Sequence, residues 1–266
     1  MIRDITLGQY YPADSALHRL DPRVKLIGTL IYVVSLFLFQ SFTGYLVASI
    51  FLVSLIIMSH VPLSFMLKGL RAIMILLIFT AVINTFLTPG RPLVEFGRFS
   101  ITIEGVRLAA FMVIRLVFLI VGSSLLTLTT TPSDLTDGLE KGLSFLKVFK
   151  VPVSEIAMMM SIALTFIPVL LEETDRIIKA QQARGADFDS GNIIRRVKAL
   201  VPILVPLFVS AFRRANELAL AMESRCYRGG QGRTKLHPLR YKKADIIAYL
   251  TLLVYIVAVV AVGLIF

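Results

Sequence analysis

The chain has 266 residues, of which 56% are hydrophobic and only 17% are charged, and its mean hydropathy is +0.80. This composition excludes an ordinary soluble globular domain and predicts an all-α integral membrane protein. The formal net charge of +11 carries topological information, because Lys and Arg of membrane proteins gather on the cytoplasmic side. A single cysteine and three widely separated histidines exclude an intramolecular disulfide and a local Cys/His metal motif.

The amino-terminal segment lacks the pattern of a secretory signal peptide. It carries Asp4, Asp14 and Asp21 and has no short apolar run that ends at a small-residue cleavage site. We therefore expect the amino terminus to stay in the cytoplasm.

Apolar runs predict about five membrane-spanning helices. The stretch 24–58 is about twice as long as one span requires and is broken only at 40–44, so it predicts a helical hairpin with both ends inside. Three more spans are expected at 72–87, 105–129 and 246–266, with a short external loop at 89–104.

Two further apolar runs, 153–171 and 199–212, conflict with the charge pattern. If the first of them crossed the membrane, the region 172–245, with fifteen Lys/Arg against eight Asp/Glu, would lie outside. We therefore interpret both runs, which contain or border prolines, as half-inserted or interfacial helices. The expected domains are a four-span membrane domain (1–130), a cytoplasmic platform of amphipathic coupling helices (131–245) and a final transmembrane helix (246–266).

The platform is predicted to begin with a capped amphipathic helix. Thr131 suits the N-cap, Pro132 the first turn, and Asp134 favours the helix dipole. One face of this helix collects four leucines, Leu135, Leu139, Leu143 and Leu146.

Inside the predicted spans, small residues and one charge stand out. Gly44 with Ala48, and the small patch that begins at Gly122, favour close helix packing. Arg115 lies near the middle of the fourth span, so backbone carbonyls, Asn84 or a polar cleft are expected to receive its charge.

Two later helices end in a similar way. The sequence Ala183-Arg184-Gly185 closes one helix, and Ser224-Arg225-Cys226 closes the other. An arginine at a helix C-terminus is often only a favourable partner for the helix dipole. Because the arrangement occurs twice, it also suits docking onto two similar cytoplasmic subunits, since a guanidinium makes bidentate contacts with carboxylates.

The chain resembles the CbiQ-like transmembrane T components of energy-coupling factor (ECF) transporters, a branch of the ABC transporters. The resemblance covers nearly the whole chain. It depends on the opening segment Pro12–Leu26, which contains Asp21-Pro22-Arg23, and on the two arginine triplets, each at the end of a cytoplasmic helix.

The resemblance implies a coupling subunit of the bacterial plasma membrane. Its partners would be two ABC ATPase subunits, which dock at the triplets, and a membrane-embedded substrate-binding S component for a vitamin or a metal. The chain itself would be non-catalytic and bind no cofactor, with ATP and Mg bound by the ATPases. It contains no G-x-x-x-x-G-K-[ST] motif, and its basic glycine-rich stretch 229–235 is interpreted as a linker.

Methionines offer a candidate contact surface for the S component. Met158, Met159 and Met160 form an adaptable run, although core filling is the more common explanation of such a run. Leu135 and Leu139 of the amphipathic helix complete this expected surface.

An intramembrane protease and a stand-alone secondary transporter are the alternative functions. An intramembrane protease is disfavoured, because the sequence Glu172-Glu173-Thr174-Asp175-Arg176 lacks the arginine spacing and the histidine that such a site needs. A stand-alone secondary transporter remains the alternative, but the predicted spans lack the acidic residues that ion coupling usually requires. Dependence on partner subunits distinguishes the two kinds of transporter, because a secondary transporter would work alone and a T component would not.

Overall fold

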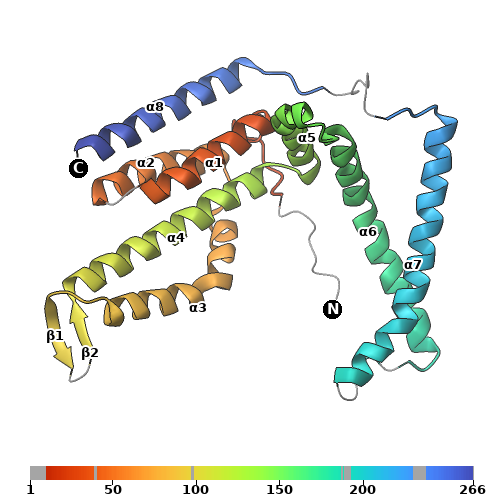
Figure 1. Cartoon of the computed structure of the whole chain (residues 1–266), viewed down its shortest axis with the longest axis horizontal. Coiled ribbons are helices and arrows are strands. Elements are labelled where there is room, and N and C mark those ends of the chain that lie inside the picture. Colours follow the sequence, from red (N-terminus) through yellow and green to blue (C-terminus); the bar gives the residue numbers. More distant parts are fainter. Residues whose placement is uncertain are drawn as a thin grey trace. The chain divides into compact units, whose positions relative to one another are not determined.

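The computed structural model describes residues 10–38, 41–96, 99–186, 188, 193–229 and 238–265. The chain divides into two compact units. The first, here called the bundle unit, comprises Gly8–Lys141 and Leu239–Phe266, and the second, the helix-pair unit, contains Gly142–Pro238. Figure 1 shows the helices of each unit along the chain.

Helices make up nearly all of both units. The bundle unit contains α1 (Pro22–Leu38), α2 (Phe42–Ser59), α3 (Leu63–Leu87), the strands β1 (Pro92–Phe96) and β2 (Phe99–Thr102), α4 (Ile103–Thr129), α5 (Pro132–Gly142) and α8 (Lys243–Ile265). The helix-pair unit contains the 3-10 helix η1 (Leu143–Phe149) and the long helices α6 (Val153–Ala183) and α7 (Ile193–Ser224). The prediction of an all-α membrane protein is confirmed.

The core of the bundle unit lies where α1, α2, α4 and α8 meet. Ala48 of α2 is fully buried, and a Cβ added at Gly122 of α4 would lie 2.6 Å from the ring of Tyr32, so both predicted small-residue positions allow close packing. The Tyr255 hydroxyl of α8 lies 2.6 Å from the Ser35 hydroxyl of α1. This buried contact ties the last helix of the chain to the first.

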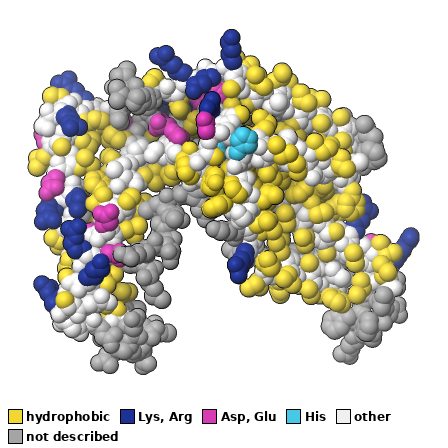
Figure 2. All heavy atoms as spheres, turned by 180° about the vertical axis from the view of Figure 1, so that it is seen from behind, with side chains coloured by type: hydrophobic (Ala, Val, Ile, Leu, Met, Phe, Trp, Pro, Cys, Tyr) yellow, Lys and Arg dark blue, Asp and Glu magenta, His cyan; other side chains and the backbone are white. Residues whose placement is uncertain are grey.

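The outer surface of the bundle unit is apolar. Leu30, Ile50 and Leu250 are each more than 60% exposed, which in water would be an aggregation hazard and in lipid is the expected surface. In Figure 2 hydrophobic side chains cover the body of this unit, whereas charged side chains gather along its edge. The chain is a multi-pass membrane protein by this distribution.

Within the described residues, five helices are long and apolar enough to span a membrane, but they are not the five that were expected. They are α2, α4, α6, residues Ala199–Ser224 of α7, and α8. The helix α1 has only 17 residues, and α3 bends by 63° between Leu63–Arg71 and Ile73–Leu87, so neither one passes as a straight span. Prolines do not interrupt α6 or α7, which run through Pro168, Pro202 and Pro206. Their interfacial placement depends on charge and stays a prediction.

One local expectation is refined and another was wrong. The loop expected at 89–104 contains a hairpin, in which β1 and β2 pair antiparallel with Glu95 opposite Ser100. The leucine-rich helix does not continue to Leu146 as one α-helix: α5 ends at Gly142, and the chain continues as η1, in which Leu143 is exposed.

The start of α5 and the partner of Arg115 are both defined by hydrogen bonds. The Asp134 backbone N–H donates to Thr131 Oγ1 at 3.1 Å, which confirms the predicted N-cap. The Arg115 Nε donates to the hydroxyl of Tyr45 at 2.9 Å. Of the receivers expected for Arg115, Asn84 is the one whose side-chain amide donates to the backbone carbonyl of Thr80.

Candidate docking sites at two helix ends

The first arginine triplet forms a complete Schellman cap at the end of α6. Arg184 is the C-cap residue, and Gly185 follows in the left-handed region with φ 86°. The Ala186 N–H donates to the carbonyl of Gln181 at 3.0 Å, and the Gly185 N–H donates to that of Gln182 at 2.9 Å. These two bonds satisfy carbonyls that the helix end would otherwise leave without donors.

The second triplet repeats this geometry at the end of α7. Cys226 is in the left-handed region with φ 56°, as Gly185 is in the first triplet. The Tyr227 N–H donates to the carbonyl of Met222 at 3.0 Å, and the Cys226 N–H donates to that of Glu223 at 2.8 Å. The two triplets therefore place their arginines at the same C-cap position of the same motif.

All six triplet residues are exposed. Within the described parts of the chain, neither Arg184 nor Arg225 forms an ion pair or a side-chain hydrogen bond. Two always-charged guanidinium groups are thus presented to the surroundings at rigid helix ends.

The helices α6 and α7 cross in antiparallel directions. Glu173 of α6 accepts a hydrogen bond from Arg214 of α7 at 3.5 Å, and the Gln181 side-chain amide donates to the carbonyl of Pro202 at 3.3 Å. Later residues of α6 thus meet earlier residues of α7, as Figure 1 also shows. Both contacts lie in the helix-pair unit.

The ion pair lies at the same sequence distance from both arginines. Arg184 follows Glu173 by 184 − 173 = 11 residues, and Arg225 follows Arg214 by 225 − 214 = 11 residues. At the rise of an α-helix this is roughly 16 Å in each case. Because the helices are antiparallel, the arginines lie on opposite sides of the ion pair, which suits contact with two separate subunits.

The methionine run begins at the other end of α6. Met159 and Met160 are 58% and 42% exposed, and Met158 is half-buried. Exposure at this level argues against a pure core-filling role for the run. Leu135 and Leu139, the other expected contacts, are half-buried in α5 of the bundle unit.

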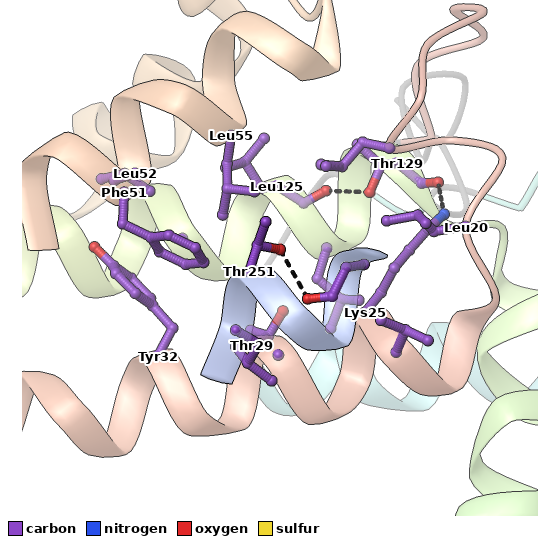
Figure 3. A pocket seen from close by; sticks show the side chains of 17 residues that line it. Leu20, Lys25, Thr29, Tyr32, Phe51, Leu52, Leu55, Leu125, Thr129 and Thr251 are labelled. Carbon is purple, nitrogen blue, oxygen red and sulfur yellow. Dashed lines mark hydrogen bonds between the residues drawn. The ribbon is translucent and has the colours of Figure 1, made fainter. Parts of the chain in front are cut away.

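The opening segment is hydrogen-bonded to the end of α4, just before α5 begins. The Lys25 ammonium donates to the carbonyl of Thr129 at 2.8 Å and to that of His18 at 3.1 Å, beside a small cavity of about 100 Å³. Figure 3 shows Lys25 reaching the last turn of α4 from α1. The Tyr11 N–H adds a bond to the carbonyl of Leu128 at 2.9 Å.

The same segment holds the start of α8. The buried Asp245 carboxylate accepts from the Asp21 N–H at 2.8 Å and from the Lys242 N–H at 2.6 Å. The Arg23 guanidinium pairs with Asp21 at 2.9 Å and lies 4.1 Å from the ring centre of Tyr241. We call Lys25, Asp21, Arg23 and Asp245 the clasp, because they tie the opening segment to the end of α4 and to the start of α8.

The electrostatics of the clasp favour an ionised Asp21. Burial alone would raise the pKa of this carboxyl, but hydrogen bonds from Arg23 and its positive charge lower the pKa below the ordinary value. Asp21 therefore stays charged at neutral pH, as its pairing with Arg23 requires.

Sequence reasoning located the triplets but not the clasp. The opening segment was noticed as a resemblance, and no pattern linked Asp21 to Asp245, which is 224 residues away. Cys226 also gave no signal for a left-handed cap, because glycine is the usual residue there. Across the described ranges no group of three or more His, Cys, Asp or Glu is placed to hold a metal ion.

Comparisons with known proteins agree with this architecture. Residues 13–236 match the family CbiQ, described as cobalt transport protein. The energy-coupling factor transporter transmembrane protein EcfT of Clostridium kluyveri is 55% identical over 258 residues, 96% of each chain. The proteins of the same name from Thermosediminibacter oceani and Bacillus subtilis are 53% and 46% identical, over 94% and 96% of each chain.

The family match covers most of the chain, and the relatives are about half identical over almost their whole lengths. This chain therefore belongs to the CbiQ family, among the transmembrane proteins of energy-coupling factor transporters.

Proposed function

We propose that this chain couples ATP hydrolysis by two partner ATPases to vitamin or metal uptake through a membrane-embedded S component, as the T subunit of an ECF-type ABC importer. The observation that carries the proposal is the pair of identical capped helix ends, each with an exposed arginine. Two equal docking points suit two similar subunits. The alternative of a stand-alone secondary transporter gives these ends no role.

In this proposal each arginine inserts into a groove of one ATPase. A guanidinium at the C-cap projects from the end of a stiff helix, so movement of an ATPase is passed along α6 or α7 and not absorbed by a loop. The residues that meet the ATPases are Ala183, Arg184 and Gly185 at one end and Ser224, Arg225 and Cys226 at the other.

Closure of the ATPase pair would then change the angle between α6 and α7. The S component would contact the exposed methionines Met158, Met159 and Met160, with Leu135 and Leu139, and would be reoriented by this change. To move a two-state equilibrium from 1:99 to 99:1 requires a differential interaction of about 5.5 kcal/mol. ATP and Mg are bound by the ATPases, and this chain supplies neither a nucleotide site nor catalysis.

The proposed topology places residues 131–245 and the amino terminus in the cytoplasm of a bacterial cell. The excess of fifteen basic over eight acidic residues in 172–245 supports this side. The ATPase-docking triplets and the clasp then face the compartment in which ATP is present.

The experiment is affinity purification of the tagged chain from its host in mild detergent. Loss of one buried interfacial arginine costs about 2 to 5 kcal/mol, so the double variant Arg184→Glu, Arg225→Glu should lose both ATPase subunits and coupled transport. The matched control is Arg176→Glu with Arg213→Glu, which changes exposed arginines of the same two helices outside the triplets.

The control variant should retain the ATPases and transport. A wild-type chain that purifies alone and still moves a solute in proteoliposomes would establish the secondary transporter instead.

A further inference from the structure

The segment η1, between α5 and α6, has exposed apolar side chains. Phe145, Val148 and Phe149 of η1 are 60%, 83% and 74% exposed. Leu146 is the half-buried residue of this segment, which packs against α6. The apolar side of η1 therefore faces away from the helix that holds it.

The 3-10 geometry sorts the side chains of this segment into stripes. With three residues per turn, residues at i and i+3 lie above one another. Ser144 and Lys147 thus fall on a polar edge, Phe145 and Val148 on an apolar one, and Phe149 follows Leu146 on the third. Lys150 follows as the C-cap residue in the left-handed conformation. An α-helix, with 3.6 residues per turn, would not align these stripes, so the change from α5 to η1 creates the amphipathic character.

The charged residues of the segment that contains η1 are all positive. From Lys141 to Ser154 the sequence has three lysines and no Asp or Glu, and the nearest carboxylates, Glu140 and Glu155, flank this run. All three lysines are exposed. Exposed apolar side chains beside lysines are the composition of segments that lie in the interface of an anionic bilayer.

We infer that η1 binds the surface of an anionic lipid bilayer, with Phe145, Val148 and Phe149 among the acyl chains and Lys147 and Lys150 at the phosphates. This site is separate from the arginine triplets and does not depend on their role. It anchors the start of α6 to the membrane while the far end remains free to move.

The absence of tryptophan from the chain makes a direct test possible. Phe149→Trp places one fluorophore on the proposed anchor, and the full-length protein is reconstituted without partners in vesicles that contain brominated lipids. With phosphatidylglycerol present, the emission should be blue-shifted and strongly quenched by the bromines but weakly by aqueous iodide. Val148→Trp is a second reporter in case the first variant does not fold.

Two single-tryptophan controls bracket the result. Leu250→Trp, on the exposed face of α8, reports full lipid quenching, and Leu220→Trp, 66% exposed in the polar half of α7, reports the aqueous limit. In the background Lys147→Glu, Lys150→Glu, or in purely zwitterionic vesicles, the lipid quenching of Trp at 149 should fall several-fold.

Iodide quenching of the Phe149→Trp protein equal to that at position 220 would overturn the inference and leave this face to a protein partner. Lipid quenching that is the same with and without anionic lipid and lysines would overturn it as well, because it would remove the role of charge.

Discussion

At the scale of single residues, the two docking ends differ at the position that carries the left-handed conformation. Gly185 adopts φ 86° without a Cβ, whereas Cys226 adopts φ 56° with one. A left-handed residue other than glycine costs roughly 1 to 2 kcal/mol. The second end is therefore built with strain that the first end avoids.

This difference predicts opposite effects of two substitutions. Gly185→Ala should destabilise the end of α6 by about 1 kcal/mol, while Cys226→Gly should be neutral or stabilise the end of α7 by a similar amount. Hydrogen exchange of the amides of Ala186 and Tyr227 measures both effects. Faster exchange at Tyr227 in Cys226→Gly would contradict the explanation.

His18 of the opening segment predicts a pH dependence. Its Nε2 lies 3.0 Å from the carbonyl of Tyr11, which can only accept, so Nε2 carries the proton and Nδ1 accepts from the Ser15 hydroxyl at 2.7 Å. Burial lowers the pKa of His18 below 6.5, the ordinary value. The neutral ring is thus the form that the folded chain favours.

A lowered pKa means that the unfolded chain binds the proton more tightly. The contribution of His18 to stability is therefore present above pH 6.5 and is lost as the pH falls through the folded pKa. Thermal midpoints of the purified protein between pH 8 and pH 5, compared with His18→Asn, should show a steeper acid decline in the wild type. Parallel curves would remove His18 from this role.

At the scale of elements, the described contacts between α6 and α7 include the ion pair of Glu173 with Arg214 and the hydrogen bond from Gln181 to Pro202. Glu173 and Arg214 are about one-fifth and one-third exposed, and their ion pair lies midway along the path between the two arginine triplets. Partly exposed pairs contribute about 0.5 to 1 kcal/mol. A pair of this strength holds a preferred crossing and still permits another one.

Removal of the ion pair should loosen this crossing. A spin label on the native, exposed Cys226 and a second on Ala183→Cys report the distance between the two helix ends. Glu173→Gln should broaden the distance distribution measured by pulsed electron resonance. Glu172→Gln, at the exposed neighbouring residue, is the matched control and should leave the distribution narrow.

Elements also differ in how far sequence patterns predict them. The capping pattern at Thr131 predicts the start of α5, because that information is local. The end of the same helix was missed, because a leucine repeat alone does not distinguish an α-helix from one that changes to 3-10 geometry after Gly142. The ends of α6 and α7 at the arginine triplets were expected, because the loss of helix formers after each arginine is a local signal, whereas α7 begins at Ile193, before the apolar run 199–212.

At the scale of the whole molecule, the clasp joins the opening segment to the end of α4 and to the start of α8. Asp245 is 1% exposed and accepts two backbone N–H groups, so Asp245→Ala would leave the buried N–H of Asp21 and the part-buried N–H of Lys242 without this partner. Each buried donor without a partner costs about 1 to 3 kcal/mol. The start of α8 would detach from α1.

We therefore expect Asp245→Ala to lower the thermal midpoint in detergent by several degrees and to reduce coupled transport. The triplets are unchanged, so the ATPases should still co-purify. Asp14→Ala is the control, because its ion pair with Arg19 is exposed and contributes little. Full transport by Asp245→Ala would show that the clasp carries no coupling.

The sequence by itself determined the solvent of this protein, its all-helical class, its family and the two arginine triplets, because hydropathy, charge and short motifs are local properties. Only the tertiary structure decided that both arginines occupy the same cap, that α6 crosses α7 in antiparallel directions, and that Asp245 holds Asp21. These features depend on contacts between residues far apart in the chain, and the energy of such contacts appears only when the helices have packed.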